Sequence, residues 1–217
     1  SAGLRAQTVT DFRIRQNVGL AFELSKKVEL TARYRLTTFD NATRFLRSMV
    51  SLNASYQIVK GWDAGIQYRY NTDYEQDYHR FFLFTKVKKK FDDVSISYRF
   101  RYQQDQDYFD QAYLNQYPAE RVLRNRLELQ YAINKRLDVY AYAEHFGEIT
   151  NLSFRSYRMR YGAGVQKVYK KRHEFSVEAF INDEFNKRRP EYVFAFDLSY
   201  TYHLKRSKKQ KRDSINL

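Results

Sequence analysis

Apolar and polar residues alternate with a period of two along most of the chain. Between residues 62 and 70, Trp62 and Ile66 share one face of an extended strand, while Asp63 and Arg69 share the other. The same alternation recurs in residues 28–38, 94–103, 127–133, 157–165 and 194–204. Less regular stretches of this pattern cover residues 11–24, 44–59, 78–87, 137–146 and 175–184. Because successive side chains of a strand point to opposite faces, the pattern predicts about eleven β-strands and almost no helix.

Short and longer polar connections separate these segments in turn. The short connections are residues 25–27, 60–61, 91–93, 134–136 and 170–172. The longer connections are residues 39–43, 72–77, 104–120, 147–153 and 186–190, and residues 105–120 are expected to form a mobile loop. A meander of antiparallel hairpins needs this arrangement. Bacterial single-chain barrels normally have an even number of strands, so we expect ten or twelve strands in the closed barrel rather than eleven.

The buried face decides between a soluble and a membrane barrel. A soluble barrel turns its apolar face inward, whereas a transmembrane barrel turns it toward lipid and lines its lumen with polar residues. Amphipathic aromatic residues end several apolar faces, as at the interfaces of a bilayer: Trp62, Tyr70, Tyr102, Tyr161 and Tyr202. Small residues stand beside charges on the polar faces, as a crowded lumen requires: Gly65, Gly162, Gly164, Ser95, Ser97, Ser199 and Thr201. Because the segments also have the roughly 9–11 residues that cross a bilayer obliquely, we predict an all-β fold, an antiparallel up-and-down transmembrane β-barrel of about 10–12 strands.

The composition excludes several other classes of protein. The 217 residues include no cysteine, which excludes disulfide frameworks and thiolate metal sites or nucleophiles. With 18% aromatic and 43% hydrophobic residues, the chain is not disordered. No apolar run reaches the roughly 18 residues of a membrane helix, so a helical membrane protein is excluded as well.

Residues 7–204 form the predicted barrel, and both ends of the chain lie outside it. Residues 1–6 read as the remnant of a secretory signal peptide, with an ordinary polar terminus as the alternative. Residues 205–217 form a basic tail, which we expect to be solvated or to bind anionic lipid headgroups.

The net charge of +14, from 39 Lys and Arg against 25 Asp and Glu, makes the charges of the lumen important. If the long loops face outward and the short turns face the periplasm, seven arginines fall in the outer half of the lumen: Arg33, Arg35, Arg69, Arg99, Arg101, Arg158 and Arg160. Three carboxylates lie at middle or outer heights, where they can pair with these arginines: Glu128, Glu144 and Glu178. Buried guanidinium groups need carboxylates or bound anions nearby. Two interpretations stay open, a salt-bridged and plugged interior or an anion-attracting constriction.

No catalytic, metal or cofactor site is predicted. The four histidines lie on different segments without metal-ligand spacing: His79, His145, His173 and His203. An esterase would have to draw on a set of residues that no nucleophile elbow surrounds: Ser153, Ser156, Ser176 and His173. Glycine-rich phosphate-binding motifs do not occur in the sequence. We therefore expect a protein that is not an enzyme and that uses no cofactor.

Interleaved arginines and aromatic residues at 98–102 also suit a soluble, basic β-barrel that binds nucleic acid. Alternation places Arg99 and Arg101 on the face opposite Tyr98 and Phe100, so phosphate contacts and base stacking would fall on opposite sides of the sheet. We keep this function as a second alternative and expect no nucleic acid among the partners. The expected partners are outer-membrane lipid, lipopolysaccharide at the outer rim, and other outer-membrane or periplasmic proteins.

Three stretches of the chain carry a family resemblance. They are residues 7–12 (QTVTDF), residues 98–103 (YRFRYQ) and residues 127–140 (LELQYAINKRLDVY), the last followed by Glu144. These strand patterns resemble an uncharacterised group of small Gram-negative outer-membrane proteins, catalogued as a domain of unknown function. The resemblance implies a β-barrel in the bacterial outer membrane and transfers no catalytic residue. The function expected first is a structural or accessory component of a cell-envelope assembly, with a narrow anion-favouring pore for small solutes as the alternative.

Overall fold

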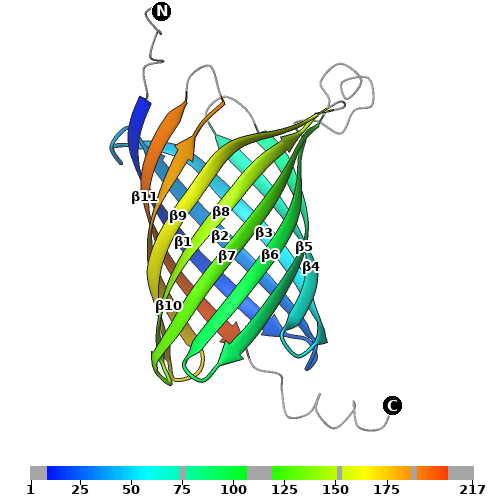
Figure 1. The fold of residues 1–217 in the computed structure, drawn as a ribbon. Helices are drawn as coiled ribbons and strands as arrows, with labels where there is room; N and C mark the ends of the chain where they lie inside the picture. Colours follow the sequence, from blue (N-terminus) through cyan, green and yellow to red (C-terminus); the bar gives the residue numbers. More distant parts are fainter. Residues whose placement is uncertain (1–8, 74–76, 107–118, 151–152, 187–189, 205–217) are drawn as a thin grey trace, which may run out of the picture.

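Eleven β-strands in the described residues close into one barrel (Figure 1). The structure is a computed structural model, and it describes residues 9–73, 77–106, 119–150, 153–186 and 190–204. The strands are β1 (Val9–Glu23), β2 (Val28–Phe39), β3 (Arg44–Val59), β4 (Trp62–Asp73), β5 (Asp77–Phe91), β6 (Val94–Gln106), β7 (Glu120–Asn134), β8 (Leu137–Ile149), β9 (Phe154–Tyr169), β10 (His173–Glu184) and β11 (Glu191–Leu204). No helix in these residues is long and apolar enough to cross a membrane. The expected signal-peptide remnant, the basic tail and most of the expected mobile loop lie outside the described residues.

The two ends of the barrel differ in their connections. At one end, which we call the turn rim, connections of two to four residues join the strands in pairs: β1–β2, β3–β4, β5–β6, β7–β8 and β9–β10. At the other end, the loop rim, connections of three to thirteen residues join the remaining pairs: β2–β3, β4–β5, β6–β7, β8–β9 and β10–β11. Gly61 shows how tight the turn rim is, because its φ is 85° and a Cβ there would lie 2.5 Å from the carbonyl oxygen of Lys88. Only glycine accepts both conditions without strain.

A parallel pair of strands closes the barrel. β1 runs parallel to β11 from Val9 opposite Glu191 to Phe22 opposite Leu204, whereas all other neighbouring strands are antiparallel. The expectation of ten or twelve strands is therefore wrong. An odd number of alternating strands makes the first and last strand run the same way, and parallel hydrogen bonds pair their edges as completely as antiparallel bonds would.

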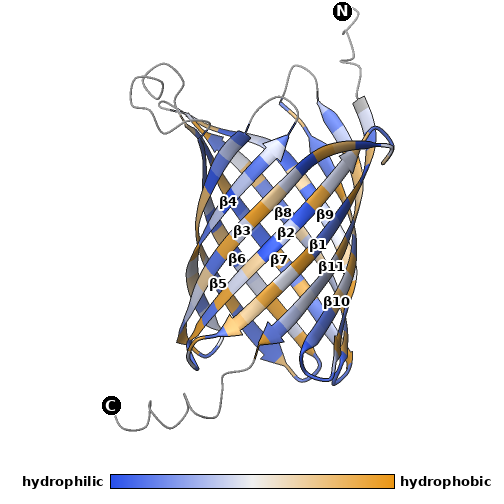
Figure 2. Cartoon of the chain, turned by 180° about the vertical axis from the view of Figure 1, so that it is seen from behind, coloured by the Kyte–Doolittle hydropathy of each residue, from blue (hydrophilic) through white to orange (hydrophobic). Residues whose placement is uncertain are grey.

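Apolar side chains cover the outside of the barrel. Ile66, Leu83 and Leu127 are 58%, 58% and 56% exposed, and hydrophobic and hydrophilic positions alternate along the strands (Figure 2). Inside, Glu144 is 1% exposed and Phe82 is 2% exposed. A soluble barrel buries its apolar face, so the structure confirms the predicted inversion, with apolar residues outside and polar residues inside.

Strand β9 differs from the sequence-based expectation at its start. It begins at Phe154, so Tyr161 lies near the middle of the strand rather than at its end. The register between β8 and β9 shifts between Phe146 and Gly147. This irregularity turns Tyr157 inward, where it is buried against Phe146, although the alternation placed it on the outer face.

Glycines on the polar face make room for long side chains in the lumen. A Cβ on Gly162 would lie 2.5 Å from Cζ of Tyr142, and a Cβ on Gly164 would lie 2.6 Å from Cζ of Tyr140. The hydroxyls of both tyrosines donate hydrogen bonds to Glu178, over 2.6 Å from Tyr142 and 3.0 Å from Tyr140. The small residues predicted for a crowded lumen therefore let two phenol rings lie flat along the wall.

Candidate functional site

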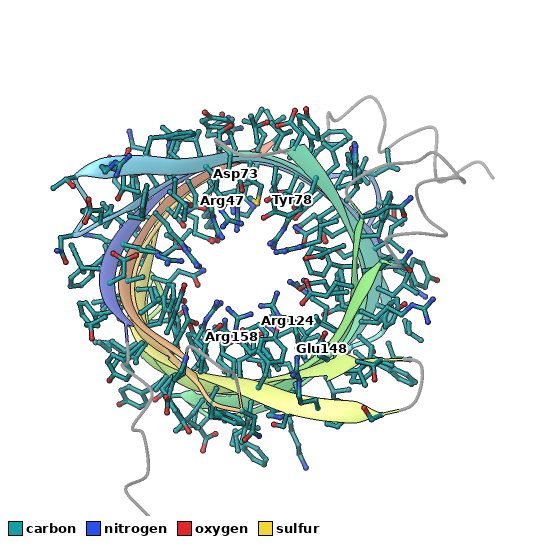
Figure 3. The ribbon with its side chains drawn as sticks, turned by 90° about the horizontal axis from the view of Figure 1, so that it is seen from above. Arg47, Asp73, Tyr78, Arg124, Glu148 and Arg158 are labelled. Carbon is teal, nitrogen blue, oxygen red and sulfur yellow. The ribbon has the colours of Figure 1, made fainter. Side chains whose placement is uncertain are left out.

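The lumen contains a cavity of about 570 Å³, and every cationic residue in the described part of its lining is an arginine. Thirteen arginines line it: Arg13, Arg15, Arg33, Arg35, Arg47, Arg69, Arg80, Arg99, Arg101, Arg124, Arg126, Arg158 and Arg160. Seven carboxylates line it as well: Asp105, Glu120, Glu144, Glu174, Glu178, Glu184 and Asp197. Thirteen positive against seven negative groups leave six positive charges in excess. Seen from the loop rim, Arg47, Arg124 and Arg158 reach toward the centre of the barrel (Figure 3).

The structure places the predicted lumen residues as follows. All seven predicted arginines line the cavity, as do Glu144 and Glu178. Glu128 lies outside the cavity lining, where it contacts Arg126 (Oε2–Nη2, 2.6 Å) and Lys86 (Oε1–Nζ, 3.9 Å). Glu178 contacts the two tyrosine hydroxyls, and no described arginine forms an ion pair with it.

Six further arginines of the cavity were not among the predicted residues: Arg13, Arg15, Arg47, Arg80, Arg124 and Arg126. The signal for Arg124 and Arg126 was available, since the alternation of residues 127–133 continues backwards along β7 to both of them. Asn125 obscures it, because this polar residue stands on the outer face. There it accepts a hydrogen bond of 2.6 Å from the hydroxyl of Tyr98.

Glu144 is the centre of the largest charge cluster. Its Oε1 lies 3.1 Å from Nη2 of Arg99 and 3.0 Å from Nη2 of Arg124, and Nε of Arg124 donates a further hydrogen bond of 3.2 Å. Its Oε2 lies 3.6 Å from Nη1 of Arg160. One fully buried carboxylate thus joins β8 to arginines from β6, β7 and β9. The cluster retains two positive charges in excess.

Five other arginines of the cavity have carboxylate partners of their own: Arg13, Arg35, Arg80, Arg126 and Arg158. Nε of Arg80 donates to Asp105 over 2.6 Å, and Nη2 of Arg35 lies 3.4 Å from Asp197. Asp197 is held in place by Asn17, whose amide donates to it over 2.5 Å across the parallel β1–β11 pair. Each of these ion pairs balances the positive charge of one arginine in the cavity wall.

Four arginines of the cavity form no ion pair with a carboxylate in the described ranges: Arg15, Arg33, Arg69 and Arg101. Arg47, the remaining arginine of the cavity, donates a hydrogen bond to the hydroxyl of Tyr78. The Nε atoms of Arg33, Arg69 and Arg101 are also buried without a hydrogen-bond partner. Buried donors of this kind are costly unless a ligand or water satisfies them.

Phenylalanine rings support the guanidinium groups in pairs. Phe82 has Arg69 and Arg101 at 4.6 and 4.8 Å from its centroid. Phe180 has Arg15 and Arg160, both at 4.6 Å. Phe146 likewise has two guanidinium groups at 4.5 Å, those of Arg124 and Arg158. Cation–π contacts of this kind fix where each positive charge stands in the lumen.

Groups suited to hydrolysis or metal binding are sparse in the described residues. No group of three or more His, Asp or Glu residues there can hold a metal ion. Nε2 of His145 lies 2.5 Å from Oγ of Ser156, but no described carboxylate contacts this histidine. His173 instead contacts the hydroxyl of Tyr200, on the face opposite Ser176. The residues considered for an esterase are therefore not brought together as a set.

Solved structures of β-barrel proteins are similar to this chain at low sequence identity. The NanC porin is 12% identical, with a TM-score of 0.53 over 84% of this chain and 93% of its own. The β-domain of the Bordetella autotransporter BrkA is 14% identical, with a TM-score of 0.46 over 82% of this chain and 84% of its own. A further porin is 13% identical, with a TM-score of 0.37 over 76% of this chain and 55% of its own. The similarity to the NanC porin shows a common β-barrel fold.

No curated protein matches the chain in sequence. A family match extends from residue 12, within β1, to residue 192, the second residue of β11. It confirms the resemblance to a catalogued domain of unknown function, and the chain belongs to the family described as "Protein of unknown function (DUF2490)".

Proposed function

We propose that this protein is a non-enzymatic β-barrel of the bacterial outer membrane whose lumen passes small anions. The location is supported by the exposed apolar face, since Ile66, Leu83 and Leu127 would be in unfavourable contact with water in a soluble protein. Outer-membrane lipid and lipopolysaccharide are the partners proposed for this surface. Arg99 and Arg101 face the cavity while Tyr98 and Phe100 face outward, which argues against a nucleic-acid platform.

The excess of arginine around the cavity carries the proposal of an anion pore. A plugged interior would pair each buried guanidinium with a carboxylate, because an unpaired buried charge is strongly unfavourable. The structure instead leaves Arg15, Arg33, Arg69 and Arg101 without ion pairs around an open volume. Rings of arginine favour anionic solutes in other pores. Mobile anions from the solution would neutralise these charges here.

A structural or accessory role is the second candidate, and the Glu144 cluster favours it. This cluster ties four consecutive strands of the wall together through ion pairs. A protein that serves only as a scaffold in the envelope would gain stability from such contacts and would need no continuous passage.

Planar bilayer recordings distinguish the two candidates. Folding is verified by heat-modifiable mobility on a gel. The folded protein should show discrete conductance steps, and in a salt gradient its reversal potential should have the sign expected for a pore selective for anions. Replacing Arg69 and Arg101 together by Glu should shift the preference toward cations. The matched control is the double variant Lys89→Glu with Lys171→Glu, which reverses the same number of charges at exposed sites near the turn rim and should shift the reversal potential less. Folded protein that remains silent at all voltages would refute the pore and favour the structural role.

A further inference from the structure

Two arginines without ion pairs flank one buried phenylalanine in the lumen. Phe82 is 2% exposed on β5, opposite Gln67 of β4 and Gln103 of β6. Arg69 and Arg101 lie two residues from these positions, one on each neighbouring strand. Their guanidinium carbons are 4.6 and 4.8 Å from the centre of the Phe82 ring. The ring therefore holds two positive charges beside the cavity.

Neither charge is neutralised by the protein in the described residues. Arg101 is 8% exposed, and its Nε has no hydrogen-bond partner. Nε of Arg69 is likewise unsatisfied, and its Nη2 donates only to the neutral side chain of Gln67, over 3.2 Å. Arg124 offers a comparison within the same lumen, because it also stands on a phenylalanine ring but contacts Glu144. Unlike Arg124, Arg69 and Arg101 have no described carboxylate beside them to balance their positive charges.

The choice of arginine indicates which anions fit. Eleven of the 16 lysines lie in the described residues, and none of these eleven lines the cavity, whereas thirteen arginines do. Lysine presents a single compact charge, which suffices to attract a halide. Arginine presents a planar fork of N–H donors that matches the paired oxygens of a carboxylate or phosphate. The Nε–H groups of Arg69 and Arg101, which have no hydrogen-bond partner within the described ranges, each supply one of the two donors of such a fork.

We propose that Arg69 and Arg101 form a binding site for small oxyanions, carboxylates or phosphates, which the lumen prefers to chloride. The proposal rests on the pore function and names its substrate class. The oxyanion would accept hydrogen bonds from the two guanidinium groups and supply the missing negative charge. Because both side chains line the interior cavity, the ligand is a dissolved ion and not the headgroup of a surrounding lipid.

The test measures block of the chloride current by oxyanions in planar bilayers at constant ionic strength. Inorganic phosphate and succinate should each reduce the chloride conductance in a saturable way. Arg69→Lys and Arg101→Lys keep the charge but remove the fork, so each should raise the half-blocking concentration by about tenfold, more than it changes chloride conductance. Arg155→Lys, at a half-exposed position outside the cavity, is the matched control and should behave as the parent protein. Bilayers with anionic phosphatidylglycerol and no added phosphate should show no block.

A binding measurement separates failure of the site from failure of the pore. In detergent micelles, phosphate or succinate should raise the urea midpoint of unfolding of the parent protein and of Arg155→Lys, but not of Arg101→Lys. A silent barrel that still shows this shift would overturn the pore function and retain the site. A conducting barrel whose current and stability ignore both oxyanions, with the Lys variants indistinguishable from the parent, would overturn the oxyanion site and leave the pore.

Discussion

Replacing Glu144 by Gln removes the one negative charge that three arginines of the lumen share. The side chain keeps its size, so the change tests charge rather than packing. Three hydrogen bonds from charged donors, one from Arg99 and two from Arg124, each contribute about 1.5–3 kcal/mol. They share one acceptor atom, so their contributions do not add, and the amide oxygen of Gln still accepts one of them. We expect a loss of about 3–5 kcal/mol, the usual cost of leaving buried charges without their partner.

Urea titration of the protein folded in detergent micelles measures this loss. The matched control is Glu148→Gln on the same strand, because Glu148 pairs with Arg155 near the loop rim, where the two side chains are 24% and 52% exposed. An exposed pair of this kind contributes about 0–1 kcal/mol. Equal free energies of unfolding for the two variants would refute the reasoning, since they would mean that the lumen around Glu144 is as well solvated as the rim.

Three further predictions concern the wall of the barrel. Leu127→Arg places a charge at the centre of the outer face of β7 and should lower the free energy of unfolding in lipid vesicles by about 2–4 kcal/mol. A loss no larger than that of Leu127→Ala would contradict a lipid-facing surface. Trp62, the sole tryptophan, is 44% exposed beside the turn rim. Lipids brominated near the headgroup should therefore quench its fluorescence more than lipids brominated near the end of the acyl chain. The reverse order of quenching would place Trp62 deep in the bilayer and contradict the prediction. Gly162→Ala should displace the Tyr142 ring from Glu178 and cost about 1–3 kcal/mol by urea unfolding, and unchanged stability would show that the ring moves freely.

The alternation of residues predicted which side chains face the lumen along the most regular strands. A strand has a strict period of two, so Ile66 and Arg69 had to point to opposite faces once either face was assigned. The prediction stopped where a polar residue occupies the outer face. Gln16 is exposed on β1 and interrupts its apolar pattern, and this hides Arg13 and Arg15 from the sequence.

Pairing within the lumen could not be predicted from the alternation. The period of a strand gives the face of a residue but neither its cross-strand register nor the reach of its side chain. Glu144 and Glu178 have the same character in sequence, yet one contacts three arginines and the other contacts two tyrosine hydroxyls. The number of strands is likewise not encoded locally, because the pairing of β1 with β11 depends on residues about 180 positions apart.

The parallel junction of β1 with β11 also separates the two ends of the folded chain. β1 begins at the loop rim and β11 ends at the turn rim, so epitopes fused ahead of Val9 and behind Leu204 would emerge on opposite sides of the bilayer. In a barrel with an even count, both epitopes would share one side. Antibodies applied to intact cells would therefore bind only one of the two, and the identity of that one would establish which rim faces the surrounding medium.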